Sequence, residues 1–391
     1  MTRLAGSSKL LRAMNESATL ALLLDRGTLT RGDLRDLTGL SKPTTSEVMR
    51  RLTDAGLAVV VGHTSGGPGP SAEIYAANPA AGHAIAISVR ETQHPHLTGV
   101  LCDLAGAEVA RAEVAVAADP VPTVVGLVDG LSRRAGLPAG SVRLVQIGLP
   151  GAYDAAAGVI RHIDVPGWDR PGLVAELGTR LGATVAADND VNLAAIAERH
   201  HGVAGEVESF ALVWFSGGLG LAIDLGGTLL RGARGGAGEI GYVPVGLGRG
   251  ADRADLTDLV GGPAVLALAR EHGIDAPTPE AAVAAGVAAA GSDRAGSFVD
   301  GLAERIAYGL AAVAAVLDPQ LIVLAGDVGR AGGDTLARRV TAALHSTTPL
   351  DTAIAVTGVA DDPVLLGAQV AAQRALRDQI IATLRDAAPA A

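Results

Sequence analysis

The chain has 391 residues and a net charge of -10, with hydrophobic residues at 49% and aromatic residues at only 2%. This length allows two or three domains around a large buried core, and the composition excludes a disordered chain. No apolar run reaches the roughly 20 residues that span a bilayer, and the N-terminus lacks the apolar stretch of a signal peptide. Cys102 is the only cysteine. We therefore expect a cytoplasmic protein without a disulfide framework or a cysteine-based metal site.

Charge is distributed unevenly along the chain. Residues 1–80 hold nine Lys and Arg against seven Asp and Glu, so the excess of acidic residues lies in the remainder. Both lysines of the chain, Lys9 and Lys42, belong to this first segment. Any contact with nucleic acid is therefore expected to be local and N-terminal.

Three short helices and a hairpin are predicted in this segment. Apolar residues between Leu10 and Leu24 recur at helical spacing, and Gly27 ends that helix. Thr30 is expected to cap a second helix that Gly39 ends, and Ser41 to cap a third that has Pro43 in its first turn. The strand runs LAVVVGH and EIYAANP flank SGGPGPSA and predict a hairpin wing. Two helices joined by a tight glycine-containing turn are typical of a helix-turn-helix.

The two faces of the third helix differ in chemistry. Its inward face is predicted to carry Val48, Met49 and Leu52. The residues expected to face outward and contact double-stranded DNA are Lys42, Thr44, Thr45, Ser46 and Arg50. Short hydroxyl side chains allow close approach to the major groove, while Lys and Arg reach phosphates or guanine edges. The alternative is a structural cap or dimerisation module.

From about residue 81 the pattern changes to strands that alternate with helices. Strand runs at 84–89, 97–104 and 112–117 precede a helix near 120–135 and the buried strand run LVQIGLP. Residues 285–319 include a long Ala-rich helix, expected between the lobes or at a dimer contact, and 363–386 form a terminal helix that returns to the first lobe. Two such halves predict a pair of α/β lobes around a cleft.

Several long motifs resemble one family. These are LTGLSKPTTSEVMRRLTDAGL, GLPGAYDAAAGVI, HIDVPGWDRPGLVAELGTRLGATVAADNDVNLAAIAE, GARGGAGEIGYVPV and LDPQLIVLAGDVG. Together they resemble the ROK family (repressor, open reading frame, kinase). The resemblance implies an α/β fold in which an N-terminal winged helix-turn-helix, residues 1–80, precedes a two-lobed actin-like sugar-kinase ATPase fold, residues 81–391. Lobe one is expected at about 81–186 plus 363–386, and lobe two at about 187–362.

The phosphate-binding motifs of the family's kinases are altered. Relatives carry an early Asp-x-Gly-x-Thr turn, whereas the matching stretch here is Ser88-Val89-Arg90-Glu91-Thr92. Asp224-Leu225-Gly226-Gly227-Thr228 fits that motif as a string, but its position predicts a hairpin turn. A second glycine loop, residues 216–220, keeps its glycines without the usual Gly-Thr start. We therefore expect no kinase activity and no cofactor.

Asp190 matches the family's general base, although Asp188 or Asp190 could instead cap the following helix. The family often places a zinc-binding His in GEIGH before a cysteine cluster. Tyr242 holds that His position here and no cysteine follows, so no metal is expected.

A residual ligand pocket is implied by the resemblance. Its candidate effector-binding residues are Asp164, Asn189, Asp190, Glu239 and Tyr242. Carboxylate and amide groups suit a polyol, because each accepts several hydrogen bonds. A sugar, another small metabolite and no small effector remain open.

The resemblance and the residues together predict a DNA-binding regulator, by preference a repressor, of sugar or related metabolism. A homodimer or dimer of dimers would read a near-palindromic operator. One alternative is an active ATP-dependent sugar kinase with an appended DNA reader. Another is a ligand-independent interaction or scaffold protein.

Overall fold

The computed structural model describes residues 5–64, 71–91, 95–163, 165–246, 248 and 253–386. They divide into two compact units. Unit 1 comprises 1–147, 174–186 and 369–391, and unit 2 comprises 148–173 and 187–368. Residues 148–173 therefore lie with the second unit, whereas the sequence placed them in the first lobe. None of the described helices is long and apolar enough to cross a membrane.

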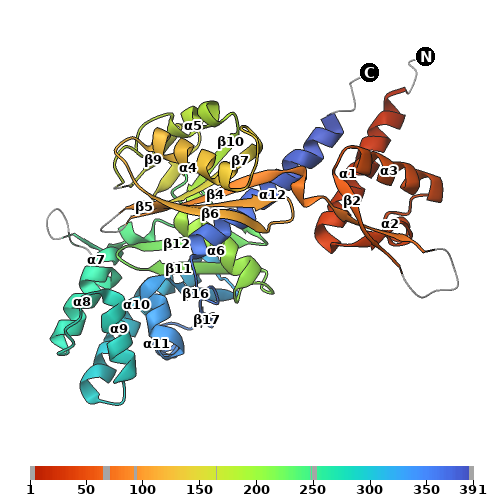
Figure 1. The fold of residues 1–391 in the computed structure, drawn as a ribbon. Helices are drawn as coiled ribbons and strands as arrows, with labels where there is room; N and C mark the ends of the chain where they lie inside the picture. The colour runs from red at the N-terminus through yellow and green to blue at the C-terminus, as the bar shows by residue number, and fades with distance from the viewer. Residues whose placement is uncertain are drawn as a thin grey trace. The chain divides into compact units, whose positions relative to one another are not determined.

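Unit 1 begins with three helices and a small sheet (Figure 1). The elements are α1 (Ala5–Arg26), β1 (Leu29–Thr30), α2 (Arg31–Thr38), α3 (Lys42–Asp54), β2 (Ala58–His63) and β3 (Glu73–Ala77), and the strand order is β1-β3-β2. Thr30 caps α2 in a capping box with Asp33, and Gly39 ends the helix at φ 70°. This confirms the predicted winged helix-turn-helix, apart from the hairpin tip, residues 65–70, which lies outside the described residues.

The rest of unit 1 is a five-stranded sheet in the order β10-β7-β4-β5-β6. The strands are β4 (His83–Arg90), β5 (His96–Asp103), β6 (Glu108–Ala115), β7 (Val142–Leu149) and β10 (Thr184–Asn189), and the helices are η1 (Pro79–Ala81), α4 (Pro120–Arg134), α5 (Leu173–Leu181) and α12 (Pro363–Asp386). β4 and β5 are buried along nearly their whole length, and Cys102 lies in this core. Leu376 and Ile380 of α12 share one apolar cluster with Leu20 of α1. From residue 369 onward the terminal helix belongs to the first unit, as predicted, whereas residues 363–368 belong to the second.

Unit 2 is built on a second five-stranded sheet in the order β13-β12-β11-β16-β17. Its strands are β11 (Ser209–Phe215), β12 (Leu219–Leu225), β13 (Thr228–Leu229), β16 (Leu321–Ala325) and β17 (Ala353–Val356). Its helices are α6 (Asp190–His201), η2 (Ile240–Tyr242), α7 (Leu256–Val260), α8 (Gly262–Glu271), α9 (Pro279–Ala288), α10 (Asp293–Leu317) and α11 (Gly326–Thr347). Two short hairpins, β8 (Ala152–Asp154) with β9 (Val159–Arg161) and β14 (Pro244–Val245) with β15 (Ala254–Asp255), complete it.

Side chains of β11 alternate between two separate cores. Val213 and Phe215 pack with residues of α8 to α11, whereas Phe210 and Leu212 pack with residues of α6. Successive residues of a strand point to opposite faces, so helices cover both faces of this sheet. Trp168 is fully buried.

Candidate functional site

Helix α3 presents at the surface most, but not all, of the residues predicted to contact DNA. Ser41 caps the helix, its hydroxyl accepting a hydrogen bond from the amide of Thr44 at 3.4 Å. Lys42 and Arg50 are exposed, and Thr44 and Ser46 are half-buried. The prediction for Thr45 was wrong, because this residue is 2% exposed and its hydroxyl donates to the carbonyl of Ser41 at 3.1 Å.

The periodicity of the helix explains the buried threonine. Thr45 precedes Val48, Met49 and Leu52 by three, four and seven residues, and all four are buried. Residues at these spacings share one helix face, so Thr45 belongs to the packing face. Of the residues predicted to contact DNA, Lys42, Thr44, Ser46 and Arg50 remain exposed or half-buried.

Arg50 is held within its own helix. Its guanidinium contacts Glu47 at 2.8 Å and Asp54 at 2.6 Å, and Arg51 contacts Glu47 at 2.7 Å. Hydrogen bonds from Arg50 and Arg51 lower the pKa of Glu47 from 4.5 to about 2, and the Glu47 bond raises the pKa of Arg50. The sequence prediction overlooked Glu47, although its spacing of three and four residues from the two arginines is an ion-pair signal.

A second contact network joins α2 to the hairpin. Arg31 at the start of α2 donates hydrogen bonds to Glu73, at 2.7 Å, and to the hydroxyl of Tyr75, both on β3. The guanidinium carbon of Arg31 also lies 5.2 Å from the centre of the Tyr75 ring. Burial and the hydrogen bond to Glu73 raise the pKa of Tyr75. This network orients the hairpin relative to the helices.

In unit 2, Asn189 rather than an aspartate caps α6. Its side-chain oxygen accepts hydrogen bonds from the amides of Val191, at 2.9 Å, and Asn192, at 3.2 Å. Its amide nitrogen donates to the carbonyl of Gly151 at 3.2 Å. Asn189 thus holds the cap position that the sequence assigned to Asp188 or Asp190, although the Asp190 carboxylate also accepts a hydrogen bond from the amide of Val191, at 2.8 Å. Asn189 therefore has little hydrogen-bonding capacity left for a ligand.

Asp188 is buried and has a dedicated partner. Arg231 donates to one oxygen of its carboxylate from Nε at 3.0 Å and from Nη2 at 2.6 Å. The other oxygen accepts from the amide of Asn189, at 2.9 Å, and from the side chain of Asn192, at 3.1 Å. Arg231 was overlooked, because it lies just outside the motifs that resemble the family. Asp190, next along the chain, is half-buried at the start of α6.

Glu239 is placed by a tight glycine turn. Gly238 has φ 96°, and a Cβ there would lie 1.9 Å from the carbonyl oxygen of Leu221. Among the described residues, Glu239 has no hydrogen-bond partner for its half-buried carboxylate. Its oxygens are therefore available to a ligand. Asp164, another candidate, lies outside the described residues.

Tyr242 pairs with a residue that sequence analysis overlooked. Its hydroxyl lies 3.4 Å from Nδ1 of His162, and the two ring centres are 5.6 Å apart. Tyr242 is 53% exposed, and His162 has a φ of 57°, which is unusual for a residue with a side chain. The His162–Tyr242 pair offers an aromatic, hydrogen-bonding surface next to Glu239 in the chain.

The stretch at the position of the family's phosphate turn lies at the end of a regular antiparallel hairpin. Ser88 and Arg90 lie in β4, which stays in antiparallel register with β5 through the pair Arg90 and His96. Thr92 lies outside the described residues. The string at 224–228 is a hairpin turn between β12 and β13, with φ 63° at Gly226 and 78° at Gly227, as predicted.

The residues at the family's zinc position do not fit a zinc ion. Tyr242 supplies a phenol where an imidazole would be needed, and the single thiol of the chain, Cys102, is buried in β5 of the other unit. Structural zinc sites are built from thiolate and imidazole ligands.

Comparisons with known proteins agree with this architecture. Residues 94–375 match the model of the ROK family. The chain is 37% identical over 157 residues to a bifunctional enzyme NanE/NanK of Brucella suis, which covers 40% of this chain and 29% of the relative. It is 25% identical over 240 residues to the xylose repressor of Bacillus subtilis, covering 60% and 61%. It is 26% identical over 251 residues to the DNA-binding transcriptional dual regulator NagC of Escherichia coli, covering 61% and 59%.

Solved structures extend the likeness over the whole fold. A crystal structure described as a ROK family transcriptional regulator, homologous to the Escherichia coli MLC protein, superposes with a TM-score of 0.76 at 18% identity. That likeness covers 96% of this chain and 99% of the other. A ROK hexokinase from Thermus thermophilus gives a TM-score of 0.63 at 23% identity over 76% of this chain and 99% of the other. At these identities the likeness concerns the fold alone.

Proposed function

The chain belongs to the ROK family, and from that premise we propose that it is a DNA-binding transcriptional regulator of sugar or related metabolism. The observation that carries the proposal is the exposed start of α3. Lys42, Thr44 and Ser46 occupy the first turns of a capped helix within a helix-turn-helix and hairpin. In this class of domain the N-terminal residues of the second helix contact base edges in the major groove.

In this proposal the sugar-kinase-like part of the chain, residues 81–391, binds a small ligand but does not phosphorylate it. The carboxylates of Asp190 and Glu239 would accept hydrogen bonds from sugar hydroxyls, and the His162–Tyr242 pair would contact the ring. Arg90 and Glu91 stand where the family's kinases have their phosphate-binding turn, and their presence argues against kinase activity. The ligand would act as an effector by binding two arrangements of a homodimeric reader with unequal affinity.

DNA binding is tested by mixing the full chain with fragmented genomic DNA of its host and sequencing what it retains. We expect a near-palindromic site. Lys42→Ala should weaken DNA binding. It should also make the negative slope of log affinity against log salt shallower by about one. Arg143→Ala is the matched control, because it removes one exposed positive charge from β7, outside α3. No enriched site with the full chain would favour the interaction-protein alternative.

The kinase alternative has its own test. The chain is incubated with ATP, magnesium and a panel of hexoses and amino sugars, and ADP release is followed. We expect none above the background of Asp190→Asn. Phosphorylation of a sugar that disappears in Asp190→Asn would overturn the assignment as a non-enzymatic regulator. Calorimetric titration of the same sugars tests the effector site, and Glu239→Gln should lower the affinity of any sugar that binds.

A further inference from the structure

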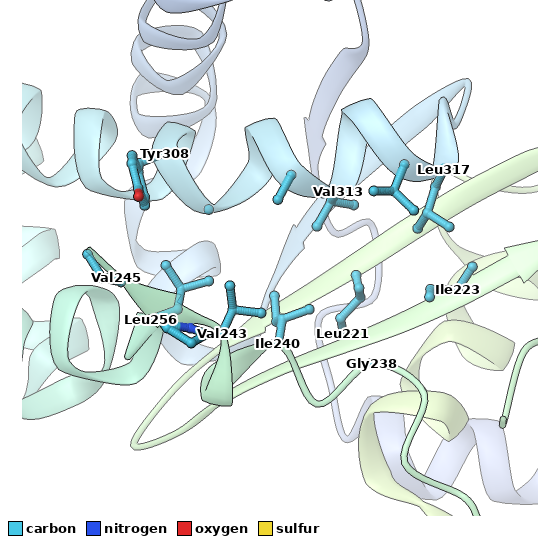
Figure 2. Close-up of a pocket in the computed structure, with 14 residues that line it drawn as sticks. Leu221, Ile223, Gly238, Ile240, Val243, Val245, Leu256, Tyr308, Val313 and Leu317 are labelled. Carbon is cyan, nitrogen blue, oxygen red and sulfur yellow. The ribbon is translucent and has the colours of Figure 1, made fainter. Parts of the chain in front are cut away.

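Two exposed surfaces of the chain differ in the chemistry that they offer a partner. The open groove between α10 and β12 in unit 2 has a volume of about 450 Å³, and the residues that line it, such as Leu221, Val313 and Leu317, carry no charge (Figure 2). The exposed side of α3 in unit 1 instead carries two arginines and two carboxylates within residues 47–54. Base edges in the major groove are told apart mainly by hydrogen bonds, so selection of a DNA sequence calls for the second surface.

Glu47 lies at the centre of the exposed side of α3. The opposite, buried side of the helix is formed by Thr45, Val48, Met49 and Leu52. Each residue of an α-helix is rotated by about 100° from the one before it, so the positions that point directly away from the buried side are 43, 47, 50 and 54. Pro43 has no polar side chain, and Asp54 is the last residue of the helix. When α3 lies in a major groove, Glu47 and Arg50 are therefore the polar side chains aimed most directly at the bases.

The carboxylate of Glu47 is held in place but remains accessible. Its Oε1 atom accepts hydrogen bonds from Arg50 at 2.8 Å and from Arg51 at 2.7 Å, whereas Oε2 accepts only from Arg50, at 3.1 Å, among the described residues. The Glu47 side chain is 46% exposed. Because each oxygen of an ionised carboxylate can accept more than one hydrogen bond, Oε2 can take a further donor from outside the chain.

An acidic side chain at this place weakens binding to most DNA sequences. Glu47 would repel the phosphates on both sides of the groove, and it also pairs with Arg50 and Arg51, which would otherwise attract those phosphates. One base compensates for this loss, because the N4 amino group of cytosine is a major-groove donor that a carboxylate accepts. Guanine presents only acceptor atoms to the major groove, and thymine presents an acceptor and a methyl group.

We propose that Glu47 sets the base preference of α3 by selecting a cytosine in each half of the operator. This inference rests on the proposed function and concerns how the same helix reads DNA. A carboxylate that weakens binding to every site without the cytosine increases the ratio of specific to non-specific affinity. Glu47 thereby acts as a specificity-determining residue even though it lowers the total affinity for DNA.

The test compares base preference in the full-length wild type, Glu47→Gln and Asp54→Asn. Asp54 is the matched control, because it lies on the same side of α3, pairs with Arg50 at 2.6 Å and loses the same charge when its carboxylate becomes an amide. Each protein is mixed with duplexes that carry the operator retained from genomic DNA, with one base pair varied at a time. Sequencing of the bound fraction gives the relative affinity for the four bases at each position.

We expect the wild type to prefer cytosine over guanine or thymine by about tenfold at one position of each half-site. Both variants should bind DNA more tightly, since each removes one negative charge. Glu47→Gln should lose the cytosine preference at that position and favour adenine, which a side-chain amide reads, whereas Asp54→Asn should keep cytosine. An unchanged cytosine preference in Glu47→Gln, or an equal loss of it in Asp54→Asn, would overturn the proposal.

A third variant makes the same test in the opposite direction. Glu47→Arg should prefer guanine at the position where the wild type prefers cytosine, because a guanidinium donates to O6 and N7 of guanine. Unchanged thermal unfolding of the variants would show that the fold is intact, as expected for an exposed position. An operator in which no base pair responds to the identity of residue 47 would overturn this inference alone. The absence of any enriched site with the wild type would instead overturn the proposed function, and this inference with it.

Discussion

Arg231 donates two hydrogen bonds to one carboxylate oxygen of Asp188, at 3.0 and 2.6 Å, and so pairs with a buried acid in β10, two residues before α6 begins. The Asp188 side chain is 11% exposed, whereas that of Arg231 is 50% exposed. Breaking the ion pair should therefore cost Asp188 more than Arg231, because the Asp188 carboxylate is the buried partner and the Arg231 guanidinium can be solvated. This asymmetry makes the pair a sensitive point of unit 2.

Removing the Arg231 guanidinium should leave the buried Asp188 carboxylate without its ion-pair partner. We expect Arg231→Met to lower the free energy of unfolding by about 1–2 kcal/mol, a reduced value because solvent screens the exposed guanidinium. Urea denaturation measures this loss. Adding Asp188→Asn to Arg231→Met should recover part of it, since the uncompensated charge is then gone. Equal stability of Arg231→Met and the wild type would show that the pair contributes nothing.

Releasing Arg50 should strengthen DNA binding. In Glu47→Gln the α3 helix loses a negative charge, and Arg50 and Arg51 lose the carboxylate they share, so that Arg50 keeps only its ion pair with Asp54. We expect tighter binding to the operator. The negative slope of log affinity against log salt, measured by fluorescence anisotropy, should become steeper by about one. Glu280→Gln, in α9, removes the same charge far along the chain and is the control. An unchanged salt slope in Glu47→Gln would count against contact between Arg50 and DNA.

The pH dependence of the same carboxylate follows from its pKa. The folded pKa of Glu47 is about 2, against an ordinary value of 4.5. A lowered carboxyl pKa stabilises the folded state above pH 4.5, and that contribution is lost as the pH falls from 4.5 toward 2. Glu47→Gln should therefore lose less stability than the wild type over this interval in thermal melts.

Thr45 should affect folding rather than recognition. Because its side chain packs against the buried face of α3, we expect Thr45→Ala to cost about 1–2 kcal/mol in urea denaturation. Ser46→Ala, at the neighbouring half-buried position, should change stability little and operator affinity more. The opposite result, with Thr45→Ala as stable as the wild type but defective in base preference, would restore Thr45 as a DNA contact.

Gly238 should be irreplaceable where Gly227 is not. Both have positive φ, but a Cβ at Gly227 meets nothing within 4 Å, whereas one at Gly238 meets the carbonyl of Leu221. Gly227→Ala should cost only about 1 kcal/mol from the backbone conformation. Gly238→Ala should cost clearly more and should displace Glu239, lowering sugar affinity. Equal losses in the two variants would mean that the turn adapts without moving Glu239.

The buried thiol of Cys102 should react slowly. Burial raises its pKa from 9 to about 11, so its thiolate fraction at pH 8 is about a hundredfold lower than that of an ordinary thiol. We expect the rate of reaction with a disulfide reagent to rise about tenfold per pH unit between 8 and 10, and to jump in denaturant. Rapid labelling of the native chain at pH 8 would contradict the burial.

The amino-acid sequence was sufficient for what depends on local pattern. Helical spacing, Thr30, Ser41 and Gly39 predicted the helix-turn-helix, because caps and turns act within a few residues of the chain. Gly226 and Gly227 likewise mark a hairpin turn whatever surrounds them. The long motifs that resemble the ROK family were enough to predict the fold of the body, which the matched family model and the solved structures support.

What only the tertiary structure decided is how these side chains share partners across distant segments. Asn189 occupies the cap position of α6 that the sequence assigned to its aspartate neighbours. Asp188 instead forms an ion pair with Arg231, 43 residues away. The hydroxyl of Tyr242 likewise lies within hydrogen-bonding distance of His162, which is 80 residues away in the chain. Periodicity cannot rank several polar residues that compete for the same helix end, because their choice depends on which donors and acceptors the folded chain brings within hydrogen-bonding distance.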